Sequence, residues 1–74
     1  MTTVYYSYFR GYPRIRSNDL ETARRMSANY LKNSGVSQDS YLGIVRVNDS
    51  GHTSAYDCAI DREYALLEVH RKYL

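Results

Sequence analysis

Hydrophobic and polar positions repeat with two different periods along the chain, and they predict a short series of strands and helices. The segment from Thr3 to Arg10 is dense in aromatic and β-branched residues, which is typical of a strand. Both faces of this strand are apolar enough to be buried, so it is either a central strand or one with an exposed aromatic face. The sequence leaves open which face is buried. Gly11 and Pro13 end the strand, because proline cannot donate a hydrogen bond to a neighbouring strand.

The next segment has helical spacing, and Arg14 to Arg16 connects it to the strand. Asn18 is the expected N-cap, with Glu21 three residues later as in a capping box. Gly35 is the expected C-terminal stop. The apolar face of this helix carries Leu20, Ala23, Ser27, Tyr30 and Leu31.

Two further runs predict a β-hairpin. Tyr41 to Asn48 reads as a strand, the cluster Asn48 to Gly51 as a turn, and Thr53 to Ile60 as a weaker strand. Gly43 lies inside the first of these strands. It indicates a bulge, a close approach of another backbone, or simple packing against a large neighbouring side chain.

Residues 62–74 fit a helix better than a strand. Asp61 can cap a helix, and Glu68 stands four residues before Lys72, a spacing that favours an ion pair on a helix. A strand would put Glu68 and His70 on the same side as Leu66, which is a poorer pattern. In the helix, His70 is expected at the edge of the core, making one hydrogen bond.

The predicted order is therefore strand, helix, strand, strand, helix, in one compact domain spanning residues 1–74. We expect an α+β fold with a three-stranded antiparallel sheet and two helices. The economical packing places both helices on one face of the sheet, which leaves the other face without cover from this chain.

Size and composition exclude several classes of protein. A hydrophobic content of 43% and a charged content of 24% over 74 residues are ordinary for a small folded domain. No apolar run reaches the roughly 18 residues of a membrane span. Cys58 is the single cysteine, so no internal disulfide can form, and a reducing cytoplasm is the expected location.

The sequence contains no recognisable catalytic, metal or cofactor motif. Cys58 with His52 or His70 lacks a visible arrangement of nucleophile, base and orienting group, and Cys58 reads instead as a small buried hydrophobic residue. The same residues with Asp57 have no metal-ligand spacing. The four glycines are dispersed and form no phosphate-binding loop. We therefore expect no enzymatic activity, no metal and no cofactor.

The strongest functional signal is a cluster of tyrosines and arginines near the N-terminus. The chain has nine Tyr, one Phe and no Trp, with a net charge of only +2. Tyrosine and arginine are enriched at the energetic centres of protein interfaces, so this cluster predicts a docking surface for another protein or for a second copy of the chain. The alternative is a single-stranded nucleic-acid or nucleotide site that stacks bases on tyrosine and binds phosphates with arginine. The predicted site residues are Tyr5, Tyr8, Arg10, Tyr12, Arg14 and Arg16.

The run NDLETARRMSANYLKNSGVSQDSYLGIVRVNDSGHTSAYDCA, Asn18 to Ala59, resembles the helix-then-hairpin body of small phage-encoded inhibitors of bacterial defence, such as anti-CRISPR proteins. The resemblance lies in short length, a compact α/β pattern and the lack of a catalytic motif, so it transfers no individual residue. It implies a non-enzymatic protein that binds and blocks a host protein or nucleoprotein complex in the cytoplasm of an infected bacterium.

Overall fold

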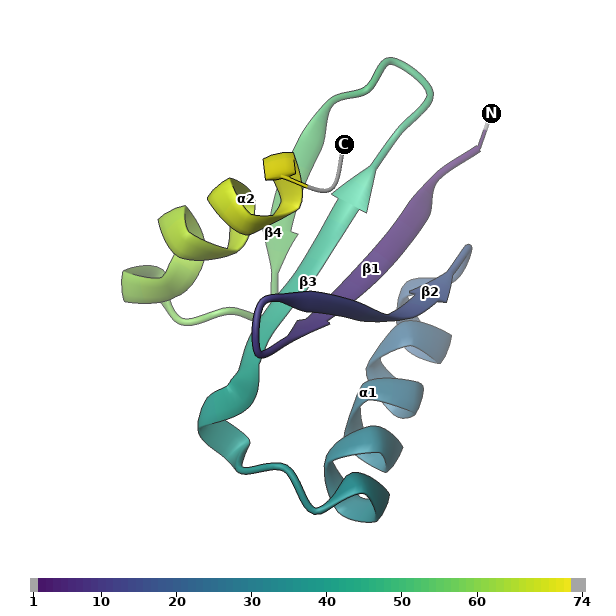
Figure 1. Ribbon diagram of the computed structural model, residues 1–74. Coiled ribbons are helices and arrows are strands. Elements are labelled where there is room, and N and C mark those ends of the chain that lie inside the picture. The colour runs from purple at the N-terminus through teal and green to yellow at the C-terminus, as the bar shows by residue number, and fades with distance from the viewer. Residues whose placement is uncertain (1, 73–74) are drawn as a thin grey trace.

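The computed structural model describes residues 2–72, which form a four-stranded antiparallel sheet and two α-helices. The sheet order is β2-β1-β3-β4, so β1 and β3 are central and β2 and β4 are the edges (Figure 1). The predicted α+β class is confirmed, whereas three strands is wrong. In chain order the elements are β1 Val4–Phe9, β2 Tyr12–Ser17, α1 Leu20–Ser34, the short 3-10 helix η1 Gln38–Ser40, β3 Tyr41–Val47, β4 Thr53–Tyr56, the 3-10 helix η2 Ile60–Arg62, and α2 Glu63–Lys72.

The additional strand is β2, which occupies the segment expected to connect the first strand to the helix. Arg10 and Gly11 both have positive φ, 55° and 83°, which is the backbone of a tight two-residue hairpin turn. Pro13 does not stop pairing, because β2 is an edge strand and an edge tolerates a missing N–H. A β-bulge opposite Ser7 and Tyr8 leaves Arg14 as the extra residue of β2.

Helix α1 begins one residue later than the sequence indicates. Asp19, not Asn18, is the N-cap: its Oδ2 accepts a hydrogen bond from the backbone N–H of Thr22 at 2.8 Å. Glu21 lies two residues after this cap and not three, so it forms no capping box, and its carboxylate accepts a hydrogen bond from Arg24. Gly35 ends the helix with a φ of 75°, as predicted.

The second hairpin is confirmed, but its last strand is shorter than expected. Strand β4 ends at Tyr56, where Asp57 takes a positive φ of 54° and turns the chain away. Ile60 consequently lies outside the sheet and is 93% exposed. Gly43 lies beside a bulge in β3, opposite Tyr8 and Phe9, so the bulge, one of the three alternatives for this glycine, is present.

The two helices cover opposite faces of the sheet, not one face as expected. Neighbouring residues of a strand point to opposite faces. Ser7 of β1 is hydrogen-bonded to Ser27 of α1, whereas the next residue, Tyr8, is hydrogen-bonded to His70 of α2. Helix α1 packs mainly on β2 and β1, and α2 packs on β3 and β4. Strand β1 is therefore covered on both sides, which explains why both of its faces are apolar.

Residues 63–72 form a helix, which confirms that interpretation of the tail; residues 73 and 74 lie outside the described part of the chain. Helix α2 buries Leu66 and His70 against the sheet. Leu66 joins Tyr8 and Val45 in the centre of the core. Neither helix within residues 2–72 is long and apolar enough to span a bilayer.

Candidate functional site

The first hairpin, formed by β1, β2 and the turn between them, accounts for the net positive charge of the protein. The first 18 residues contain three arginines and no acidic residue, whereas the rest of the chain contains seven basic and eight acidic residues. Arg10, Arg14 and Arg16 are all exposed, and none of them forms an ion pair with another residue in the range 2–72. Unpaired arginines keep their five N–H donors available for carboxylate or phosphate groups.

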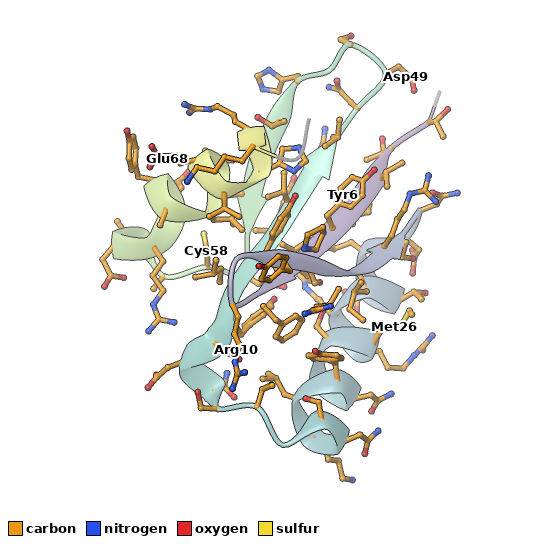
Figure 2. The ribbon with its side chains drawn as sticks, viewed as in Figure 1. Tyr6, Arg10, Met26, Asp49, Cys58 and Glu68 are labelled. Carbon is orange, nitrogen blue, oxygen red and sulfur yellow. The ribbon has the colours of Figure 1, made fainter. Side chains whose placement is uncertain are left out.

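The hairpin presents these arginines from three different positions. Arg10 lies in the turn, where its backbone N–H donates to the carbonyl of Ser40 at 2.9 Å (Figure 2). The guanidinium carbon of Arg14 lies 5.2 Å from the ring centroid of Tyr12, a cation–π contact, and Tyr12 itself is 52% exposed. Arg16 pairs across the strands with Tyr6. Four of the six predicted site residues are thus exposed on one hairpin.

The other two predicted residues do not join this surface. Tyr8 is 1% exposed, and its hydroxyl is 2.6 Å from Nδ1 of His70. The expectation that Tyr8 lies at the surface is wrong, because α2 covers its face of β1. Tyr5 is half-buried and points to the opposite face from Tyr8, where its ring meets that of Tyr56 edge-on at 6.3 Å.

Tyr5 belongs instead to a second Tyr–Arg cluster that sequence reasoning missed. Arg46 of β3 pairs with Tyr5 in register and donates from Nη1 to the hydroxyl of Tyr56 at 2.8 Å. These three residues come from different strands, so no local motif marks them. The sequence did offer one signal. Alternation along β3 places Arg46 on the opposite face from its two neighbours, and the hairpin turn brings β4 beside β3.

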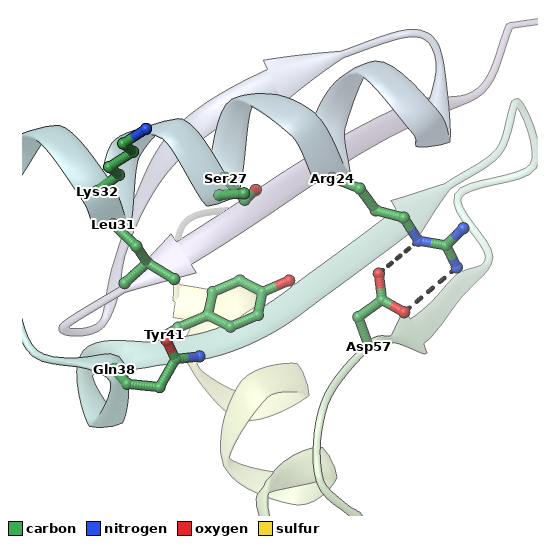
Figure 3. Close-up of a pocket in the computed structure, with 8 residues that line it drawn as sticks. Arg24, Ser27, Leu31, Lys32, Gln38, Tyr41 and Asp57 are labelled. Carbon is green, nitrogen blue, oxygen red and sulfur yellow. Dashed lines mark hydrogen bonds and ion pairs between the residues drawn. The ribbon is translucent and has the colours of Figure 1, made fainter.

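A groove of about 550 Å³ lies between α1 and the start of β3 (Figure 3). At one end, Arg24 binds Asp57 through Nε at 2.6 Å and Nη2 at 3.2 Å, and its Nη1 also binds Glu21 at 2.7 Å. These contacts neutralise the guanidinium. Tyr41 points its hydroxyl along the groove toward this pair (Figure 3). The lining residues are Arg24, Ser27, Ala28, Leu31, Lys32, Gln38, Tyr41 and Asp57.

The groove and its surroundings offer weak means for acid–base or nucleophilic chemistry. Burial raises the pKa of Tyr41 to about 12, so its phenol stays protonated at neutral pH. Burial, followed by the charge of Glu63, also raises the pKa of Cys58, so the thiol is not activated as a nucleophile. Within residues 2–72, no three His, Cys, Asp or Glu side chains lie close enough together to hold a metal ion.

The first hairpin and the groove beside Tyr41 are two candidate recognition sites. The hairpin has three arginines without an ion pair in residues 2–72 and an exposed ring, whereas Arg24 of the groove is already bound by two carboxylates. The hairpin is the stronger candidate because Arg10, Arg14 and Arg16 form no ion pair within residues 2–72. No protein-family model, curated protein or solved structure matches this chain.

Proposed function

We propose that this chain is a non-enzymatic binding protein that docks through its first hairpin on an acidic surface of a partner protein. The observation that carries the proposal is the concentration of Arg10, Arg14 and Arg16 on one hairpin, without ion-pair partners in the described chain, beside the exposed ring of Tyr12. Arginine and tyrosine side chains of this kind supply most of the binding energy at protein interfaces. Charge complementarity would also raise the rate at which the protein associates with its partner.

The arrangement of the tyrosines favours a protein partner over single-stranded nucleic acid. A base-stacking site needs exposed aromatic faces spaced along the path of the strand. Tyr8 is buried, Tyr5 packs edge-on against Tyr56, and Arg14 lies over the ring of Tyr12. The three tyrosines therefore form no common stacking platform: Tyr8 lies in the core, Tyr5 in a second cluster and Tyr12 in a cation–π pair. Nucleic-acid binding remains the second candidate, supported by the arginines alone.

The resemblance to phage-encoded inhibitors suggests how such a protein acts. An inhibitor of this kind covers a functional surface of a host protein or nucleoprotein complex, and it needs shape and charge but no catalytic group. The neutral thiol of Cys58 and the neutral phenol of Tyr41 are consistent with that role. We therefore propose inhibition by occupancy of a bacterial host protein as the most specific form of the function.

Replacing Tyr12 and Arg14 together with alanine is expected to weaken partner binding about tenfold or more without unfolding the domain. Both side chains are exposed, and truncating a side chain that contributes strongly to an interface costs more than about 1 kcal/mol. The measurement is capture of partners from a bacterial lysate by the immobilised protein, followed by the affinity of the purified partner.

A matched control removes the same two side-chain types from α2. Tyr64 is 69% exposed and Arg71 is exposed, so Tyr64→Ala with Arg71→Ala tests whether loss of any surface ring and cation suffices. Equal capture by the hairpin variant and the control would exclude the hairpin as the docking surface. Capture that disappears after nuclease treatment would support the nucleic-acid candidate instead.

A further inference from the structure

Strand β2 is an edge of the sheet, and no other strand within residues 2–72 pairs with its outer side. The sheet ends at β2, and α1 packs on β2 and β1 from one face. One stripe of α1, with the helical spacing i, i+3, i+4, i+7, faces a groove of about 430 Å³ beside Ile15 of β2. Met26 in this stripe is 40% exposed, and its side chain lies on the outer side of α1 (Figure 2). The groove is lined by Ile15, Met26, Asn29, Tyr30, Asn33 and Ser34.

The two faces of β2 differ in character along its edge. Ile15 is half-buried and pairs with Ser7, which places it on the face covered by α1. Arg16 pairs with Tyr6 on the opposite face and is exposed. A strand that pairs with β2 would therefore meet two different surfaces. One face would contact the apolar groove, which is bordered by the side-chain amides of Asn29 and Asn33, and the other face would contact Arg16.

We propose that the free edge of β2 accepts an extended segment of the partner in which apolar and acidic residues alternate. This inference rests on the proposed docking through the first hairpin and names the chemistry of its partner. Strand addition at a sheet edge gains affinity from backbone hydrogen bonds and specificity from pockets that receive alternate side chains. Apolar side chains of the added strand fill the groove beside Ile15 and Met26, and acidic side chains face Arg16.

The arginines of β2 disfavour a second copy of the chain at this edge. Antiparallel pairing of β2 with another β2, centred on Ile15, would bring Arg14 of one copy against Arg16 of the other. Like charges directly opposite each other destabilise a strand pair, and charged residues with a proline at an edge prevent self-association. The edge therefore selects a segment of opposite charge.

The direct test uses a capped nine-residue peptide that alternates Glu and Val, titrated into the ¹⁵N-labelled protein. We expect saturable shifts of the backbone amides of β2 and of the α1 stripe, and slower hydrogen exchange in β2. A matched peptide that alternates Lys and Val should bind at least tenfold more weakly. Absence of saturable shifts with the Glu–Val peptide at millimolar concentration overturns the inference.

Two methylated peptides separate strand addition from simple charge attraction. An added strand hydrogen-bonds along only one of its edges, so its N–H groups pair in only one alternate set. N-methylation of every Glu and N-methylation of every Val should therefore differ, one abolishing binding and the other leaving it intact. Equal binding of both methylated peptides overturns the inference, because backbone pairing would then not contribute.

The variant Met26→Glu tests the groove. Met26 is partly exposed, so the substitution should leave the fold intact while placing a carboxylate where the apolar side chains bind. We expect at least a tenfold loss of Glu–Val peptide binding, with no loss for Arg71→Glu on α2. If Met26→Glu still captures the cellular partner as the wild type does, while Tyr12→Ala with Arg14→Ala does not, strand addition is wrong and docking by the hairpin stands.

Discussion

Gly43→Ala is expected to remove most of the stability of this domain. Gly43 has a φ of 127°, and a Cβ built on it would lie 2.6 Å from Cβ of Cys58 and 3.1 Å from Cδ2 of Leu66. Backbone strain of this kind costs about 1–3 kcal/mol, and forcing a methyl group into a packed core costs about 1–3 kcal/mol more. A single core of this size supplies only about 3–5 kcal/mol. The variant should therefore be largely unfolded or close to it at room temperature.

The matched control is Gly51→Ala. Gly51 also has a positive φ, 78°, but a Cβ there meets no atom within 4 Å, so only the strain of the backbone applies. We expect a loss of about 1–2 kcal/mol for the control. Urea titration followed by circular dichroism measures both. Equal losses for the two variants would show that Cys58 and Leu66 move aside, and that the close contact at Gly43 is not the cause of the destabilisation.

The elements with local signals were predictable. Gly35 ends α1 because a left-handed residue closes the helix, and the cluster from Asn48 to Gly51 closes the second hairpin. The charge spacing of the tail identified α2. Each of these signals acts over a few residues and requires no knowledge of the rest of the fold.

Strand β2 was not predicted, because the sequence signals in this segment conflict. The hairpin turn at Arg10 and Gly11 lacks the Asn–Gly or Asp–Gly pair that marks such turns. Pro13 then reads as the end of a strand, although an edge position tolerates it. The alternation of Arg14, Ile15 and Arg16 was present in the sequence, but three residues are too few to separate a strand from a connection.

The proposed docking surface was predictable in its arginines but not in its rings. Arginines of a hairpin without neighbouring acids remain exposed wherever the helices pack. The burial of Tyr8 depends on α2, which comes from the far end of the chain and lies on the face opposite α1. Only the non-local packing of the two helices decides which tyrosines of β1 a partner can reach.

Removing either partner of the buried hydrogen bond between Tyr8 and His70 is expected to destabilise the fold. His70 is 2% exposed, its Nδ1 lies 2.6 Å from the hydroxyl of Tyr8, and its Nε2 has no hydrogen-bond partner among residues 2–72. Tyr8→Phe leaves the buried imidazole without this partner, at a cost of about 1–3 kcal/mol. Replacing both partners by apolar residues costs less than the sum, so Tyr8→Phe with His70→Leu should be non-additive. Strict additivity in urea titrations would contradict a direct coupling.

The stability of the protein is expected to fall as the pH drops below about 6.5, and His70 is the cause. Burial lowers the pKa of His70 below its usual value of 6.5, so the unfolded chain binds this proton more readily than the folded one. The contribution of the neutral imidazole is complete above 6.5 and is lost as the pH falls through the lower folded pKa. Hydrogen bonds from Thr22 lower the pKa of Asp19 from 3.8, so its contribution is lost only in more acidic solution. Melting temperatures measured from pH 8 to pH 5 should decline for the wild type and stay level for His70→Leu; the same decline in both would exclude His70 as the titrating group.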